Sequence, residues 1–296
     1  MSGIKELKHR IDSITEMHKI TNAMHLIAST KMQKAKNKLE KTEPFFRELK
    51  SEMNYMLENA VHIKSRYVEK SNGFTDYLAP TGIVVITADK GLAGAYNHNV
   101  IKKALETNEL YKNSRFYLVG ESGIHSFESL VPKNKIAFKT SSDNPTHAKA
   151  KLITDKLLKD FDSEQIDRIV LVYTDFKNTL VSNAISEQLI PIKMERKAHR
   201  DYSVEFYPSA EDLLNTFITG FIDDLIFSAL VDSFCSEQSS RMMAMESANK
   251  NSMATLESLK LKYNHIRQSA ITQEITEISA AAKHQKQRLE RLEGDK

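Results

Sequence analysis

The sequence predicts an α/β protein: a Rossmann-like domain with a mostly parallel sheet, joined to a long antiparallel two-helix coiled coil that the N- and C-terminal helices form. Three observations support this prediction. Residues 221–293 contain no Gly or Pro, residues 4–43 contain none either, and between them short apolar segments alternate with helical patterns. Such alternation is typical of parallel sheets with helices on their faces.

The N-terminal helix is predicted from apolar residues that are mostly three or four positions apart. The residues expected to form one seam are Ile4, Leu7, Ile11, Ile14, Met17, Ile20, Met24, Ile27, Met32, Ala35 and Leu39. Pro44 is expected to kink or restart the helix rather than end it, because the same spacing resumes at Phe45 and Leu49. A continuous helix over residues 4–43 would be roughly 60 Å long.

The central segment is predicted to form the α/β domain. Strands are expected at residues 83–88, 115–119, 136–140 and 168–174, and helices at residues 95–107, 122–130 and 145–161. Residues 179–192 and 204–207 are expected to add edge strands. The domains predicted in this way are an N-terminal helix at residues 1–63, the α/β domain at residues 74–207 and a C-terminal helix at residues 209–293.

The C-terminal helix is predicted to begin after Ser209, which can cap it, with Glu211 and Asp212 favourable in the first turn. A helix over residues 221–293 would be roughly 110 Å long, too long for its N-terminal partner to cover. A heptad seam runs through Leu256, Leu259, Tyr263, Ile266 and Ala270 and shifts to Ile271, Ile275, Ile278 and Ala282. Either the central domain flanks part of this helix, or another protein covers its far end.

Composition excludes several classes of protein. The net charge of +3 excludes a bulk polycation. Basic residues outnumber acidic ones in residues 1–41, which suits either a solvated helix face or an acidic partner. The single cysteine, Cys235, excludes an internal disulfide and is expected to be buried. Because no signal peptide and no run of ~20 apolar residues is found, a soluble intracellular protein is expected.

The turn at residues 89–94 is the candidate nucleotide site, because it carries two glycines between a predicted strand and helix. It matches neither G-x-G-x-x-G nor G-x-x-x-x-G-K-[ST], which favours ordinary turn chemistry. His18 and His25 share a helix face but have no carboxylate at ligand spacing, so no metal site is predicted. The residues alone therefore indicate no active site.

Several segments resemble the γ subunits of F-type (rotary) ATP synthase, of the bacterial type. Residues 11–35 (IDSITEMHKITNAMHLIASTKMQKA) resemble the N-terminal signature of that family, and residues 87–94 (TADKGLAG) resemble its central loop motif. Residues 236–245 (SEQSSRMMAM) and 263–275 (YNHIRQSAITQEI) resemble its C-terminal signature. The resemblance extends from end to end in the same order.

This resemblance implies a central-stalk rotor subunit, which couples ion flow through the membrane c-ring to ATP synthesis or hydrolysis by rotating inside the ring of α and β subunits. The implied partners are the α and β subunits, the ε subunit and the c-ring, with no nucleic acid and no direct membrane insertion. The implied location is peripheral, on the cytoplasmic face of the cell inner membrane. The resemblance implies no catalytic residues, metal or cofactor in this chain, because ATP and ADP are bound by partner subunits.

The resemblance also assigns contact residues. Met24 and Lys31 are placed beside the ring and the acidic lever segment of β, and Arg241 matches the arginine of the family's A-R-M-x-A-M pattern. The positions that hydrogen-bond a loop of the ring in family members are matched by Arg267, Gln268 and Thr272. Tyr207 is assigned to the c-ring and ε side, although its segment reads Phe-Tyr-Pro-Ser where Tyr-Glu-Pro-Ser is typical.

Two alternatives remain open at this point. The first is a nucleotide-binding α/β enzyme that uses the turn at residues 89–94 and has a coiled-coil oligomerisation arm, and tight binding of ATP by the purified chain would favour it. The second is a coiled-coil adaptor that does not rotate. Crosslinking the helix tip to a β subunit would uncouple a rotor and leave an adaptor unaffected.

Overall fold

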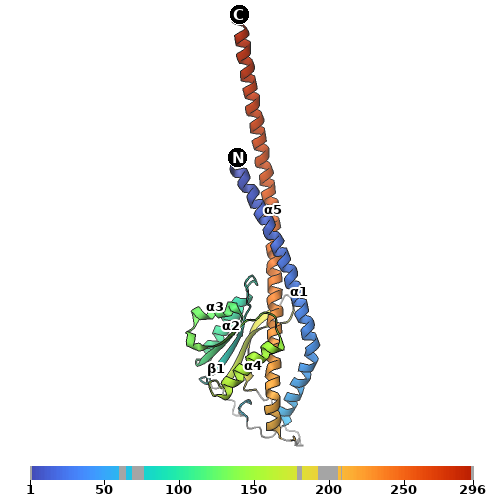
Figure 1. Ribbon diagram of the computed structural model, residues 1–296, viewed down its shortest axis with the longest axis vertical. Coiled ribbons are helices and arrows are strands. Elements are labelled where there is room, and N and C mark those ends of the chain that lie inside the picture. The colour runs from blue at the N-terminus through green and yellow to red at the C-terminus, as the bar shows by residue number, and fades with distance from the viewer. Residues whose placement is uncertain are drawn as a thin grey trace. The chain divides into compact units, whose positions relative to one another are not determined.

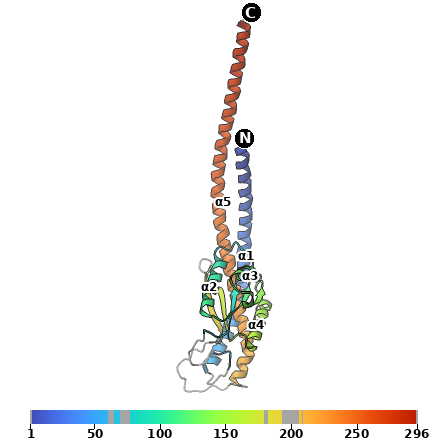
Figure 2. The same cartoon turned by 90° about the vertical axis from the view of Figure 1, so that its left-hand side faces the viewer.

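The computed structural model describes residues 2–59, 65–68, 77–178, 182–192, 206–207 and 209–294. The chain divides into two compact units. Unit 1 consists of Met1–His25 together with Met245–Lys296, and unit 2 is Leu26–Ala244. The two longest helices, α1 (Ser2–Asn59) and α5 (Ala210–Gly294), contribute to both units and run in opposite directions (Figures 1 and 2). The predicted antiparallel pair of terminal helices is thus confirmed.

Unit 2 contains a five-stranded sheet with the strand order β3-β2-β1-β4-β5. The strands are β1 (Thr81–Ile86), β2 (Ser114–Val119), β3 (Ile136–Thr140), β4 (Arg168–Phe176) and β5 (Ser182–Ile190). The first four strands pair in parallel, and β5 is an antiparallel edge strand beside β4. The predicted mostly parallel sheet is confirmed. Of the second expected edge segment, residues 204 and 205 lie outside the described residues, and Phe206 and Tyr207 are not in a strand.

Both faces of this sheet are covered. Ile83 and Val85 of β1 belong to a core cluster with residues of α2 (Tyr96–Leu110) and α3 (Glu121–Leu130). Val84 and Ile86 point to the other face, into a larger cluster that contains residues of α1, α4 (His147–Asp162) and α5. Figure 1 shows these helices around the sheet. Because successive strand residues face opposite sides, a sheet covered twice requires continuously apolar strands.

Two predictions about the ends and continuity of the long helices are confirmed: Ser209 caps the start of α5, and α1 continues past Pro44. The Ser209 hydroxyl accepts a hydrogen bond from the backbone N–H of Asp212 at 3.1 Å and donates one to its carboxylate at 2.6 Å. These bonds satisfy a free N–H group at the start of α5. Pro44 lies inside α1, which continues to Asn59.

The α5 helix contains an 18-residue window that is long and apolar enough to cross a membrane, with a mean hydropathy of 1.5. Half of that window is buried inside the structure, however. A core helix of a globular protein passes the same test of length and composition, so this window is weak evidence for a membrane span.

The seam of α1 differs from the predicted one. Met17 and Ile20 were expected in the seam, but they are 56% and 59% exposed. The half-buried positions that continue from Ile14 are His18 and Thr21, and the Thr21 hydroxyl donates a hydrogen bond to the Asn249 side chain on α5. The prediction followed the apolar residues, whereas the three- and four-residue steps of the helix place polar residues at the interface here. Polar residues at seam positions weaken a coiled coil but help to fix its register.

Of the glycines whose surroundings the structure describes, Gly120 combines a positive φ with the closest backbone contact for an added Cβ atom. Its φ is +104°, and a Cβ atom would lie 2.3 Å from the carbonyl oxygen of Thr87. We expect Gly120→Ala to lower the free energy of unfolding by about 3 kcal/mol, because strain and a backbone clash add. Urea unfolding followed by circular dichroism measures this loss. Gly91→Ala is the matched control, since no atom lies within 4 Å of its added Cβ, and an equal loss in both variants would contradict the explanation.

Candidate functional site

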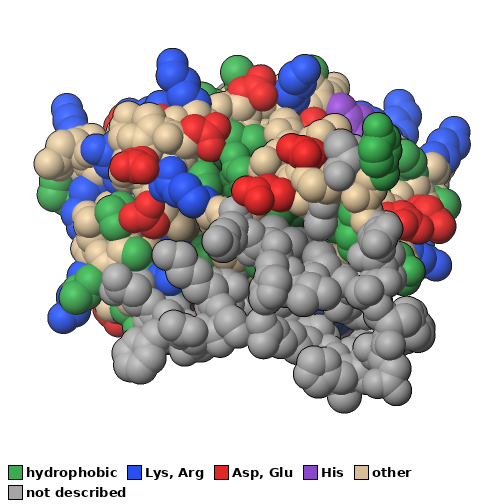
Figure 3. Space-filling model, turned by 90° about the horizontal axis from the view of Figure 1, so that it is seen from below, with side chains coloured by type: hydrophobic (Ala, Val, Ile, Leu, Met, Phe, Trp, Pro, Cys, Tyr) green, Lys and Arg blue, Asp and Glu red, His purple; other side chains and the backbone are tan. Residues whose placement is uncertain are grey.

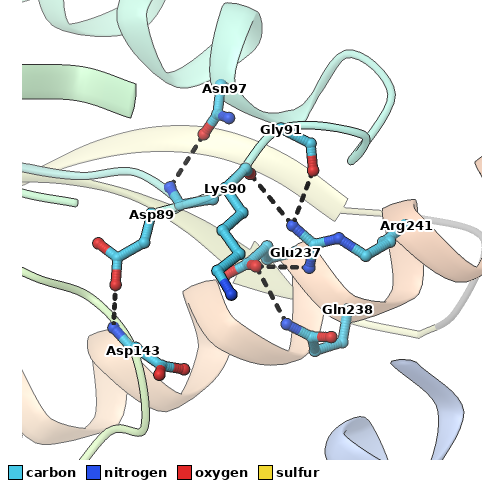
Figure 4. A network of polar contacts seen from close by, with 9 residues as sticks. Asp89, Lys90, Gly91, Asn97, Asp143, Glu237, Gln238 and Arg241 are labelled. Atoms are coloured by element: carbon cyan, nitrogen blue, oxygen red, sulfur yellow. Dashed lines mark hydrogen bonds and ion pairs between the residues drawn. The ribbon is translucent and has the colours of Figure 1, made fainter. Parts of the chain in front are cut away.

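A buried polar network in unit 2 joins α5 to the loop that follows β1 (Figure 4). Arg241 is only 8% exposed, and its guanidinium donates to the Glu237 carboxylate at 2.6 Å. The same group donates to the carbonyl oxygens of Lys90 and Gly91, both at 3.1 Å. Gln238 donates a further hydrogen bond to Glu237 at 3.0 Å. One arginine therefore links one turn of α5 to two backbone carbonyls of the motif at residues 87–94.

The electrostatics of this network depend on burial. Burial raises the pKa of Glu237 above its ordinary value, and the hydrogen bond and charge of Arg241 oppose that rise. Lys31 on α1 also acts to lower the pKa of Glu237, which places it near the network although its own side chain is exposed. Tyr96, which begins α2, has a raised pKa because of burial and the nearby charge of Glu237. The network is thus a buried ion pair of Glu237 and Arg241, on which the nearby charge of Lys31 also acts.

Asp89 anchors the other side of the same loop. Its carboxylate accepts hydrogen bonds from the backbone N–H groups of Asp143 at 2.7 Å, Ser142 at 2.8 Å and Glu121 at 3.1 Å. Partial burial alone would raise the pKa of Asp89, but these hydrogen bonds outweigh it and hold the pKa below its ordinary value. The adjacent Ala88 N–H donates to the Asn97 side chain at 2.9 Å. The loop is therefore fixed at several points.

The α5 helix fills the crevice where ligands bind in open α/β sheets. That crevice lies at the C-terminal ends of the strands where the strand order reverses, which here is between β1 and β4. The Ser233 hydroxyl of α5 accepts a hydrogen bond from the Thr174 N–H of β4 at 3.3 Å, and Arg241 binds the loop after β1. Residues 233–239 of α5 are all buried. The chain's own helix thus occupies the position of a ligand.

Metal binding finds no support among the residues that the structure describes. They contain no group of three or more His, Cys, Asp or Glu side chains that could hold a metal ion. His18, for which the sequence predicted no metal site, lies half-buried in the seam of unit 1. In the described part of the chain its Nδ1 atom is buried without a hydrogen-bond partner.

In unit 1, the pairing of α1 with α5 stops well before the end of α5. The bond from Thr21 to Asn249 fixes the register. In an antiparallel pair each step forward on one helix matches a step back on the other, so residue 2 lies level with about residue 268. The half-buried residues of α5 agree with this register, because they end at Ile266, and residues 267–283 are all exposed.

The exposed end of α5 carries a row of isoleucines. Ile271, Ile275 and Ile278 are 46%, 59% and 67% exposed, and they lie three or four residues apart. Such spacing places them on one side of the helix. Exposed apolar rows of this kind are typical of surfaces that another protein covers.

The structure distributes the predicted contact residues over both units. In unit 1, Met24 is half-buried on α1, and three exposed residues lie on α5: Arg267, Gln268 and Thr272. Gln268 and Thr272 are one helical turn apart, and the Thr272 hydroxyl donates to the Gln268 carbonyl at 2.9 Å. In unit 2, Lys31 is exposed, Tyr207 is 93% exposed and Arg241 is buried. The partner contacts of these residues stay predictions.

In the view from below in Figure 3, acidic and basic side chains of the described residues lie next to one another, and these residues show no large patch of a single charge there.

Sequence reasoning missed Glu237 and the anchoring role of Asp89. A signal for the first was present, because Glu237 precedes Arg241 by four residues, a spacing that brings opposite charges together on a helix. The second had no local signal, because the donors to Asp89 come from segments more than thirty positions away.

The comparisons with known proteins agree over most of the chain. The family model described as ATP synthase matches residues 3–284. The ATP synthase gamma chain of Acetivibrio thermocellus is 34% identical over 293 residues, which cover 95% of this chain and 99% of that protein. The gamma chain of Caldanaerobacter subterraneus subsp. tengcongensis is 35% identical over 296 residues, with the same coverage of 95% and 99%.

A solved structure supports the same assignment. A chain in the structure of the central stalk and c-ring of Tetrahymena thermophila mitochondrial ATP synthase matches with a TM-score of 0.58 and 27% identity. The match covers 77% of this chain and 99% of that chain. The family predicted from the motifs is confirmed, and the chain belongs to the family of ATP synthase gamma chains.

Proposed function

We propose that this chain is the central rotor shaft of an ATP synthase. In this proposal the exposed end of α5 turns inside a ring of α and β subunits, and unit 2 meets the ε subunit and the membrane c-ring. Ion flow through the c-ring would turn the shaft and drive ATP synthesis, and ATP hydrolysis would drive the reverse rotation. The chain would be peripheral, on the cytoplasmic face of the membrane. The exposed isoleucine row beyond the reach of α1 is the observation that carries the proposal.

The isoleucine row indicates a surface that a partner covers. A helix that leaves three isoleucines exposed at helical spacing requires an apolar partner surface, because exposed apolar rows are costly in water. Family membership supports a ring of subunits as that partner. The exposed end of α5 is then the part that enters the ring, and the proposed division of the chain remains the one predicted: residues 1–63, 74–207 and 209–293.

The proposed absence of catalysis in this chain rests on the crevice of the sheet. In enzymes of this fold class, a substrate or nucleotide enters at the switch point between the strands. Here α5 is hydrogen-bonded to the backbone at the switch point. Ser233 accepts a hydrogen bond from the Thr174 N–H, and Arg241 donates one to the Lys90 carbonyl. We therefore assign binding of ATP and ADP to partner subunits, with no cofactor or metal in this chain.

The proposed contacts with the ring follow the resemblance residue by residue. Met24 and Lys31 on α1 would face the acidic lever of β, and Arg241 is proposed as a further contact with the same partner. Gln268 and Thr272 would form, with Arg267, a latch on a loop of the ring. Tyr207 would lie on the c-ring and ε side, where its 93% exposure leaves it available.

The latch predicts a defect when its polar groups are removed. We expect Gln268→Ala and Thr272→Ala each to weaken assembly or lower the ATPase rate of the reconstituted complex. A hydrogen bond to a charged group contributes about 1.5–3 kcal/mol, enough to favour one orientation without locking it. Gln273→Ala and Thr276→Ala are matched controls about one turn further along α5. Unchanged assembly and rate in the first two variants would exclude the latch.

A further inference from the structure

The carboxylate of Asp89 lies where an oxyanion is held in many α/β proteins. Its three N–H donors come from two loops at the C-terminal edge of the sheet. Glu121 is the first residue of α3, so its N–H lies at the positive end of a helix dipole. Ser142 and Asp143 are consecutive residues after β3, and successive N–H groups that point to one place form an anion-binding nest.

A fourth polar group belongs to the same site. Ser142 is 7% exposed, and within the residues that the structure describes its hydroxyl makes no hydrogen bond that satisfies both distance and angle. It lies close enough to Asp89 to help lower the pKa of that carboxyl. The site therefore offers four hydrogen-bond donors: three backbone N–H groups and one buried hydroxyl. A carboxylate that only caps the start of a helix needs fewer donors than this. The set of donors matches a site that surrounds an oxyanion with several oxygens.

We propose that Asp89 is a built-in ligand, whose carboxylate fills an oxyanion site of the kind that holds a phosphate group in nucleotide-binding α/β folds. The site is therefore closed to phosphates and nucleotides in the native chain. The proposal concerns the sheet edge of unit 2 and does not depend on the function proposed above.

The built-in ligand has a mechanical consequence. Lys90 and Gly91 directly follow Asp89, and their carbonyl oxygens receive the Arg241 guanidinium of α5. Asp89 is thus a positioning residue: it ties the loop to the ends of β2 and β3 and presents two carbonyls to α5. The oxyanion that would be a ligand in an enzyme serves here as a permanent joint between the sheet and the long helix.

The proposal is tested with two substitutions of Asp89, one that empties the oxyanion site and one that keeps it filled by an uncharged side chain. Asp89→Ala removes the carboxylate and leaves a space, whereas Asp89→Asn keeps the space filled without the charge. The readout is hydrogen exchange of the full-length chain, measured by mass spectrometry on peptides that contain Glu121 or Ser142 and Asp143. Each chain is measured with sodium phosphate, with sodium formate and with sodium chloride at equal ionic strength.

We expect exchange of these amides to become about tenfold faster or more in both variants, because charge-assisted hydrogen bonds are lost. Phosphate and formate should restore protection in Asp89→Ala, saturably and beyond the effect of chloride. They should change neither Asp89→Asn nor the native chain. Unaltered exchange in Asp89→Ala would overturn the proposal, as would a failure of phosphate to restore protection. Equal protection by phosphate in all three chains would overturn it too, since that result indicates a general salt effect.

Discussion

Arg241→Ala is expected to lower the free energy of unfolding of the chain by about 3–5 kcal/mol. The substitution removes the partner of Glu237, whose side chain is 9% exposed, and leaves a carboxylate buried without a countercharge. It also releases the carbonyls of Lys90 and Gly91 from α5. Breaking one side of a buried ion pair costs more than the pair itself contributes, because the remaining charge is desolvated.

Urea unfolding followed by circular dichroism measures this loss, and two controls define its origin. Lys250→Ala breaks an ion pair with the same four-residue spacing, Glu246 with Lys250, but on an exposed surface where little change is expected. Adding Glu237→Gln to Arg241→Ala should recover part of the stability, because the unpaired charge is removed. If the double variant is no more stable than Arg241→Ala, the buried charge is not the cause.

The loss in Arg241→Ala should also depend on pH. The pKa of Glu237 is raised by burial, and without Arg241 we expect it to rise further. An acid with a raised pKa in the folded state favours folding when it is protonated, and that contribution is lost as the pH rises through the folded pKa. The difference in stability between the native chain and Arg241→Ala should therefore be largest at neutral pH and shrink in acid. A difference that is constant from neutral pH to pH values near the ordinary pKa of a glutamate would contradict this account.

The combined variant Ile271→Gln, Ile275→Gln and Ile278→Gln should change how the chain associates. The isolated native chain is expected to self-associate, because burial of each isoleucine stabilises a complex by up to roughly 1.5–3 kcal/mol. The variant should sediment as a monomer over the same concentration range in analytical ultracentrifugation. It should also assemble poorly with α and β subunits, because the same side chains would contact the ring.

Leu261→Gln is the control for that variant. Leu261 is 68% exposed on α5 within the stretch level with α1, so it is an exposed apolar residue outside the isoleucine row. It should affect neither self-association nor assembly strongly. The prediction would be contradicted if the isolated native chain stays monomeric and its α5 helix is protected from hydrogen exchange through residue 283. That result would mean that the exposed isoleucines need no partner surface.

The strands and long helices could be predicted because their signals are local. Strand β1 is apolar from Ile83 to Ile86 because both faces of the sheet are covered, and α5 is free of Gly and Pro over residues 221–293. The seam of α1 could not be read completely, because His18 and Thr21 are polar residues at buried positions. Only their pairing with α5 shows that they face the partner helix rather than water.

Only part of the candidate site could be predicted from the sequence: the loop was identified, but the residues of α5 that contact it were not. The motif at residues 87–94 drew attention to the correct loop, but its interpretation as a possible nucleotide turn depended on strand-to-helix geometry alone. The occupants of the crevice come from far along the chain: Arg241 is about 150 positions after Lys90 and Gly91. Contacts at such separations follow from the packing of α5 on the sheet, which no local pattern in the sequence specifies.

Rotation of this chain can be observed directly in a reconstituted complex. Lys112 is exposed in unit 2, and Lys112→Cys provides a site for a probe while the α and β subunits are fixed to a surface. The one native cysteine, Cys235, is buried, which raises its pKa to about 12 and keeps it unreactive. The account predicts that the probe turns in one direction when ATP is added and stops when ATP is removed. Sustained ATP hydrolysis with a stationary probe on an intact complex would contradict it.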